Sequence, residues 1–126
     1  MNQKDIKIVA GQINTTPKAI KANIDLHLKA WDKAAADGAD LIVMPEQSIT
    51  GYPLQDMALN DDVLEAAKKG LRFLQAESAE RHTAIVVGLP IKVEGKIYNS
   101  AYLIDRGELK GPIKKRHLPN EEVFDE

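Results

Sequence analysis

The sequence predicts an α/β fold, with a mixed β-sheet and two helices on one of its faces. In the first half of the chain, two segments with apolar residues at helical spacing alternate with short apolar runs typical of buried strands. In the second half, strand-like segments follow one another across tight-turn signals. The alternation predicts parallel strands joined by right-handed crossovers, and the later turns predict antiparallel strands at the edge of the sheet.

The first strand is expected over residues 6–12, because Ile6, Ile8 and Ala10 alternate with their neighbours. Thr16 and Pro17 predict a helix start, since threonine caps helices and proline suits the first helical position. Gly38 predicts the end of that helix. Its apolar face carries Ile20, Ile24, Leu28, Trp31 and Ala35.

The remaining elements follow from similar signals. Residues 39–44 and 83–90 are apolar runs that predict strands covered on both faces. Asn60 followed by two aspartates predicts the start of the second helix. The pairs Glu94-Gly95 and Arg106-Gly107 predict two turns. They flank a strand over residues 96–105, and a last strand contains Ile113.

Composition excludes several classes of protein. The 126 residues fit one domain or part of one, and a net charge of −2 gives no reason to expect nucleic acid or a membrane as partner. The absence of cysteine excludes disulfides, cysteine zinc sites and a thiol nucleophile within these residues. The three histidines lack ligand-type spacing, so no metal site is expected. With no signal segment or membrane-length apolar run, a cytoplasmic protein is expected.

The predicted layer leaves one face of the sheet uncovered. The strands are apolar on both faces, yet only two helices are available to cover them. We therefore expect the chain to form a homo-oligomer or to pair with another segment of its own domain.

Glu46 is the first candidate catalytic residue. It directly follows the apolar run 39–44, and open α/β sheets build their sites at the carboxyl ends of strands. A carboxylate held there suits a general base. The alternative is a solvated loop glutamate or a side chain that caps nearby amides.

Lys115 is the second candidate. In a regular strand, Lys114 and Arg116 would share one face and Lys115 would take the other. An ammonium group turned alone into a crevice needs a counter-charge, and Glu46 is a candidate partner. The alternative is a solvated basic strand.

The ordered set of motifs resembles the nitrilase superfamily of carbon–nitrogen hydrolases. MPEQSITGYP, with Glu46, is similar to the superfamily's P-E-x-x-x-x-G-Y motif, and KKRHLPN, with Lys115, to its K-x-x-L-P motif. The segments IKIVAGQIN, GADLIVMPE and IYNSAYLIDRGEL resemble the strands around these motifs. Within the superfamily, T-G-Y-P, H-L-P-N and V-F-D-E are most similar to the glutaminase domains of glutamine-dependent NAD synthetases. The resemblance spans nearly all 126 residues.

The resemblance implies the first half of an αββα sandwich and a Glu-Lys-Cys mechanism that releases ammonia from a small amide, with glutamine as the expected substrate. Glu46 would be the base and Lys115 would stabilise the oxyanion. Tyr52 and Glu121 would border the substrate pocket, although Tyr52 also fits a half-buried aromatic in a turn. No cofactor is implied for this chain, because ATP and Mg²⁺ belong to the separate synthetase domain of such enzymes.

Two departures from the family pattern leave alternatives open. The family's cysteine lies well beyond its lysine, so residues 1–126 correspond to the N-terminal part of the domain and are expected to be inactive alone. Glu121 stands where relatives carry an aromatic residue, so another nitrilase-type small-amide hydrolase remains an alternative. A third interpretation is a non-catalytic truncated module that pairs with a partner chain.

Overall fold

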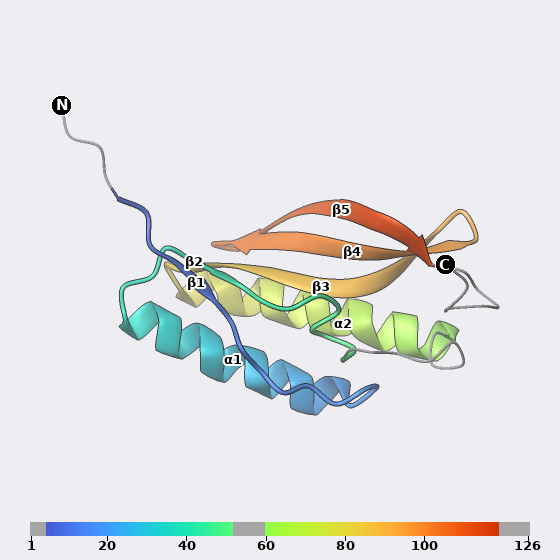
Figure 1. The fold of residues 1–126 in the computed structure, drawn as a ribbon, viewed down its shortest axis with the longest axis horizontal. Coiled ribbons are helices and arrows are strands. Elements are labelled where there is room, and N and C mark those ends of the chain that lie inside the picture. The colour runs from blue at the N-terminus through green and yellow to red at the C-terminus, as the bar shows by residue number, and fades with distance from the viewer. Residues whose placement is uncertain (1–4, 52–59, 119–126) are drawn as a thin grey trace.

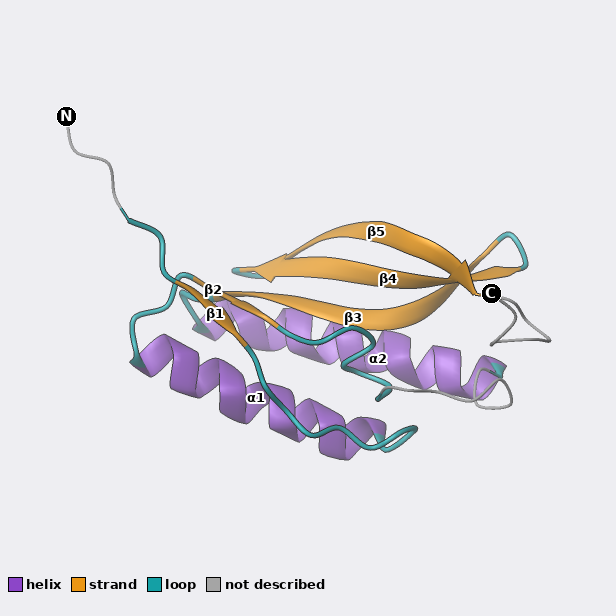
Figure 2. Cartoon of the chain, in the orientation of Figure 1, coloured by secondary structure: helices purple, strands orange, loops and turns teal. Residues whose placement is uncertain are grey.

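The computed structural model describes residues 5–51 and 60–118, of which 115–118 are described by their backbone alone. Three strands and two helices alternate first, and two more strands follow (Figures 1 and 2). A short 3-10 turn, Ser78–Glu80, follows the second helix. The bounds are β1 Ile8–Ala10, α1 Ile20–Ala36, β2 Leu41–Val43, α2 Asp61–Glu77, β3 Ala84–Val93, β4 Lys96–Asp105 and β5 Glu108–Leu118.

The five strands form one mixed sheet in the order β1-β2-β3-β4-β5. β1 pairs with β2, and β2 with β3, in parallel. β4 and β5 are added antiparallel. This arrangement confirms the predicted α/β class and the predicted order of elements.

Both helices lie side by side on one face of the sheet (Figure 1). Their apolar faces meet alternate residues of the strands, including Ile42 of β2 and Ile85 of β3, to form one hydrophobic core. Trp31 of α1 is fully buried there, and its indole nitrogen donates to the carbonyl oxygen of Thr83 over 2.8 Å. The core also contains Ile24, Leu71, Leu74, Val87, Leu89 and Ile104.

The opposite face of the sheet is not covered by either helix. Val43 and Ile113 remain exposed, at 38% and 66% of their surface. Among the residues that the structure describes, no helix is long and apolar enough to cross a membrane.

The predicted start of the first helix is wrong. α1 begins at Ile20, its N-cap is Ala19, and no side chain caps it. The backbone of Thr16 is instead held by the side chain of Asn23, which both accepts from its N–H and donates to its carbonyl. Lys18 has a positive φ of 65°, and this turns the chain into the helix.

Both predicted hairpin turns are confirmed. Glu94 and Gly95 have φ of 52° and 79°, and Arg106 and Gly107 have φ of 48° and 84°. Two-residue turns with positive φ at both positions match the twist of paired strands, which is why glycine stands second in each. The second helix also begins as predicted, because the side chain of Asn60 accepts from the Val63 N–H over 2.9 Å.

β5 contains an irregularity that regular alternation does not predict. Arg116 pairs with Asn99 and Lys114 pairs with Ser100, so Lys115 is an extra residue in the ladder. Such a bulge interrupts the two-residue period of the strand. Strict alternation therefore does not tell on which face of the sheet the side chains of residues 114–116 lie.

Candidate active site

Glu46 lies in a turn that follows the carboxyl end of β2 and is partly buried. The turn is tied to the adjacent strand β3. The Met44 N–H donates to Val86 O over 2.9 Å, and the Ile49 N–H donates to Gly88 O over 3.0 Å. These two bonds continue the pairing with β3 beyond the last residue of β2, and they fix the backbone on both sides of Glu46.

Gly88 allows the turn to approach β3 closely. A Cβ atom at this position would lie 2.5 Å from the backbone nitrogen of Gln47, which is closer than non-bonded atoms tolerate. Gln47 itself has a positive φ of 51°, a conformation that costs a non-glycine residue free energy. The residue after Glu46 is thus held in an unfavoured conformation against a glycine.

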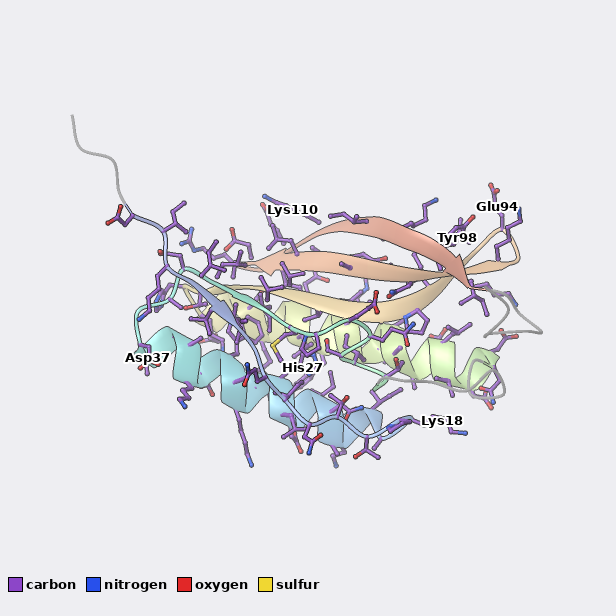
Figure 3. All side chains as sticks on the ribbon, in the orientation of Figure 1. Lys18, His27, Asp37, Glu94, Tyr98 and Lys110 are labelled. Carbon is purple, nitrogen blue, oxygen red and sulfur yellow. The ribbon has the colours of Figure 1, made fainter. Side chains whose placement is uncertain are left out.

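A buried polar chain connects this turn to helix α1. His27 is fully buried (Figure 3), and its Nδ1 lies 2.7 Å from Asn23 O. A carbonyl oxygen only accepts, so Nδ1 carries the proton and Nε2 accepts from the hydroxyl of Ser48, 2.8 Å away. The Ser48 oxygen in turn accepts from the Gly88 N–H over 3.2 Å. Burial lowers the pKa of His27, and the bond to Asn23 only partly offsets this effect.

Asn99 of β4 contacts the candidate base directly. Its Nδ2 donates to Oε2 of Glu46 over 2.5 Å. By strand alternation, Asn99 lies on the sheet face opposite the helices, together with Gly88 and Ala101. The carboxylate of Glu46 therefore lies over the open face of the sheet.

A cavity of about 70 Å³ adjoins Glu46, and Gly88 of β3 and Ser100 and Ala101 of β4 contribute to its wall. Two larger clefts of about 530 and 460 Å³ lie elsewhere, one between β1 and α1 and the other between α2 and β3. Glu46 lines neither of them. Of these three cavities, only the small one is lined by Glu46, so a group held in it would lie against this carboxylate.

The structure describes two of the four predicted site residues. Besides Glu46, it gives the backbone of Lys115 as the extra residue of β5 beside Asn99 and Ser100. Lys114 is engaged elsewhere, since its Nζ lies 5.0 Å from the centre of the Tyr98 ring. Tyr52 and Glu121 lie outside the described residues.

Sequence reasoning missed Asn99, Ser48 and the role of His27. The sequence feature that could have pointed to such residues is a polar residue within an apolar segment, such as Asn99 and Ser100 in the strand over residues 96–105. Within residues 5–51 and 60–118, no group of three or more His, Cys, Asp or Glu side chains could hold a metal ion.

The profile of the Carbon-nitrogen hydrolase family matches residues 7–126. The chain belongs to this family. Glutamine-dependent NAD(+) synthetases are similar to this carbon–nitrogen hydrolase chain. The protein of Rhodobacter capsulatus is 34% identical over 120 residues, which are 95% of this chain and 22% of the relative. That of Synechocystis sp. is 36% identical over 126 residues, with 94% and 22% covered.

Solved structures agree with the family assignment. The glutamine-dependent NAD(+) synthetase of Cytophaga hutchinsonii superposes with a TM-score of 0.81 at 30% identity, covering 92% of this chain and 20% of that one. A mutant of the Nesterenkonia AN1 amidase, from the nitrilase superfamily, gives a TM-score of 0.74 at 28% identity, covering 94% and 46%. The chain thus spans about a fifth of the NAD synthetases that it matches, and about half of the amidase.

Proposed function

We propose that residues 1–126 are the N-terminal part of a glutamine amidohydrolase domain that supplies ammonia for NAD synthesis. The main support is the position of Glu46, a carboxylate fixed beyond the end of β2 beside a small cavity. Similarity to glutamine-dependent NAD(+) synthetases over 95% of the chain supports glutamine as the substrate.

In this proposal, a cysteine from outside these residues is the nucleophile. Glu46 takes the thiol proton, and the thiolate attacks the amide carbon. The ammonium group of Lys115 stabilises the oxyanion that forms. When the carbon–nitrogen bond breaks, Glu46 gives its proton to the leaving nitrogen, so ammonia and a thioester result. Water then attacks the thioester while Glu46 takes its proton. The carbon–sulfur bond breaks, and Glu46 returns the proton to the sulfur, which restores the thiol and releases glutamate.

Tyr52 and Glu121 are proposed to border the substrate pocket, as the motif resemblance implies. A panel of amides tests glutamine as the substrate against the nearest alternative. The similarity to the Nesterenkonia amidase makes a simple aliphatic amide the second candidate substrate. Higher kcat/KM for acetamide than for glutamine would favour that alternative.

A fusion protein tests the reaction. Residues 1–126 replace the matching segment of the Rhodobacter capsulatus NAD(+) synthetase, and ammonia release from glutamine is measured. We expect release by the fusion, and a loss of at least about 100-fold in kcat in Glu46→Gln and Lys115→Met. Lys114→Met is the matched control, with kcat expected to remain within about threefold. A fusion that releases ammonia equally well with Glu46→Gln would refute the assignment.

The purified 126-residue chain is expected to release no ammonia from glutamine, because it has no thiol to form the acyl intermediate. We also propose that the open sheet face, with Val43 and Ile113, is covered by the rest of the domain. Sedimentation velocity tests this point. The chain alone is expected to self-associate, and a dilute, well-folded monomer would contradict the proposal.

A further inference from the structure

Among residues 97–103 of β4, which the structure describes throughout, Asn99 alone sends a polar side chain to the open face of the sheet. By strand alternation, Ile97, Ala101 and Leu103 share that face with it. Asn99 is nevertheless fully buried. Burying an amide is unfavourable unless its polar atoms form hydrogen bonds, so an apolar residue would suit the sheet better at this position.

Within the described part of the chain, the side chain of Asn99 is bonded at one end only. Its Nδ2 donates to Oε2 of Glu46 over 2.5 Å, whereas its Oδ1 has no hydrogen-bond partner there. The next residue shows the alternative, since the hydroxyl of Ser100 donates to Leu89 O over 2.7 Å and so supports the sheet itself. The hydrogen bonding of the Asn99 side chain among these residues therefore serves Glu46 alone.

This bond supplies what the backbone of the turn cannot. The bonds from Met44 and Ile49 to β3 fix the main chain on both sides of Glu46, but a glutamate side chain still rotates about three torsion angles. Asn99 is a firm support for the carboxylate, because β4 lies between β3 and β5 and pairs with both of them at this residue. The main chain of Glu46 is thus held by β3, and its carboxylate by β4.

We propose that Asn99 is a positioning residue that selects the oxygen through which Glu46 exchanges protons. Nδ2 of Asn99 occupies Oε2, whereas Oε1 has no hydrogen-bond partner among the described residues. Oε1 is therefore the oxygen that takes the thiol proton, and the small cavity lies against the same carboxylate. The catalytic meaning of this selection rests on the proposed function.

A neutral amide suits this task because Glu46 must change its charge during the reaction. No cation of the described residues forms an ion pair with Glu46. A cation bonded at Oε2 would favour the carboxylate over the acid more strongly than an amide does, and would oppose protonation. When Oε1 carries the proton, Oε2 is the carbonyl oxygen of the acid and still accepts from Nδ2. Asn99 thus holds the side chain in one place while the proton is taken and given.

Nuclear magnetic resonance of the 126-residue chain, with its asparagine side chains labelled with ¹⁵N, tests the bond without requiring activity. The Hδ2 resonances of Asn99, assigned by their loss in Asn99→Asp, are compared in the parent chain, in Glu46→Ala and in Glu94→Ala. Glu94 is an exposed turn residue and provides the matched control. We expect Glu46→Ala to move the Hδ2 resonances upfield, because their acceptor is lost, and Glu94→Ala to leave them in place. Unchanged resonances in Glu46→Ala would overturn the proposal, as would equal shifts in the two variants.

Kinetics of the fusion protein test the catalytic meaning. Asn99→Asp keeps the shape of the side chain and loses the donor, and Asn99→Leu keeps the approximate size and loses both polar ends. We expect kcat to fall about 10- to 100-fold in both variants, with KM changed less than about threefold, because Oε1 is misplaced while the pocket is intact. The matched control is Asn60→Ala, which removes the side-chain bond of another asparagine at the start of α2 and should keep kcat within about threefold.

Three outcomes of these kinetics would overturn the positioning role. A kcat within about threefold of the parent in Asn99→Asp would show that only the shape of the side chain matters. A loss of kcat/KM carried by KM would indicate a disturbed pocket, and an equal loss of kcat in Asn60→Ala would indicate general destabilisation. If the unsubstituted fusion releases no ammonia, the proposed function fails, while the resonances still decide whether Asn99 holds Glu46.

Discussion

Nε2 of His27 on α1 lies 2.8 Å from the hydroxyl oxygen of Ser48, two residues beyond Glu46, and both side chains are buried. The pair joins the helix layer to the turn that carries the candidate base. Because Nδ1 already donates to Asn23 O, the bond requires a neutral imidazole.

Stability should therefore fall in mild acid. Burial lowers the pKa of His27 in the folded chain below its ordinary value of 6.5, so the unfolded chain binds a proton first as the pH falls. The contribution of neutral His27 is complete above pH 6.5. It is lost below that value, at up to about 1.4 kcal/mol per pH unit, until the folded pKa is reached. Urea unfolding between pH 5 and pH 8 measures this slope.

His82, which is exposed, provides the matched control for that titration. His27→Gln should flatten the pH dependence in the acid range, while His82→Gln should leave it as in the parent chain. An identical slope in the parent chain and in His27→Gln would show that His27 does not cause it.

Removing the Ser48 hydroxyl should destabilise the fold beyond the loss of one bond. Ser48→Ala leaves both Nε2 of His27 and the N–H of Gly88 without their present partner. Each unsatisfied buried group costs about 1–3 kcal/mol in the free energy of unfolding. Ser100→Ala, which removes a single bond to Leu89 O, is the comparison. Urea titration at pH 7.5 should show a larger loss in the free energy of unfolding for Ser48→Ala than for Ser100→Ala. Equal losses would argue against the linked hydrogen bonds that join His27, Ser48 and Gly88.

Gly88→Ala should displace the turn that holds Glu46. The added methyl group would meet the backbone nitrogen of Gln47, which cannot rotate away as a side chain can. We expect a loss of about 1–3 kcal/mol in the free energy of unfolding. Gly95→Ala has open space around its methyl group and only its positive φ to oppose it, so about 1 kcal/mol is expected there. In the fusion protein, Gly88→Ala alone should also lower kcat.

The cap of α2 gives a prediction that depends on one hydrogen bond. Asn60→Ala removes the acceptor for the Val63 N–H and should cost about 1 kcal/mol in the free energy of unfolding. Asn60→Ser supplies another capping oxygen and should recover most of the loss. Thermal unfolding followed by circular dichroism measures both variants, and a serine variant as unstable as the alanine variant would contradict the capping role.

Local sequence signals were sufficient for the elements whose causes are local. Asn60 caps the helix that starts next to it, and Glu94-Gly95 closes the hairpin between adjacent strands. The order of strands followed from the same signals, because short connections keep successive strands adjacent.

Features with long-range causes could not be predicted in this way. Thr16 fails to cap α1 because the side chain of Asn23, seven residues later, binds its backbone and also donates to Ile49 O. The inserted Lys115 depends on the pairing of two strands, and a run of basic residues contains no sign of it. The contact between Asn99 and Glu46 joins residues 53 positions apart, so only the folded sheet brings it about.

The bonds from Met44 and Ile49 to Val86 and Gly88 make the location of Glu46 dependent on the register of β3. Deleting one residue at the start of β3 would shift these partners together, and a residue with a side chain would then stand where the glycine now permits close approach. Homologous chains are therefore expected to vary in length at the 94–95 and 106–107 turns and to keep a constant spacing between residues 84 and 88.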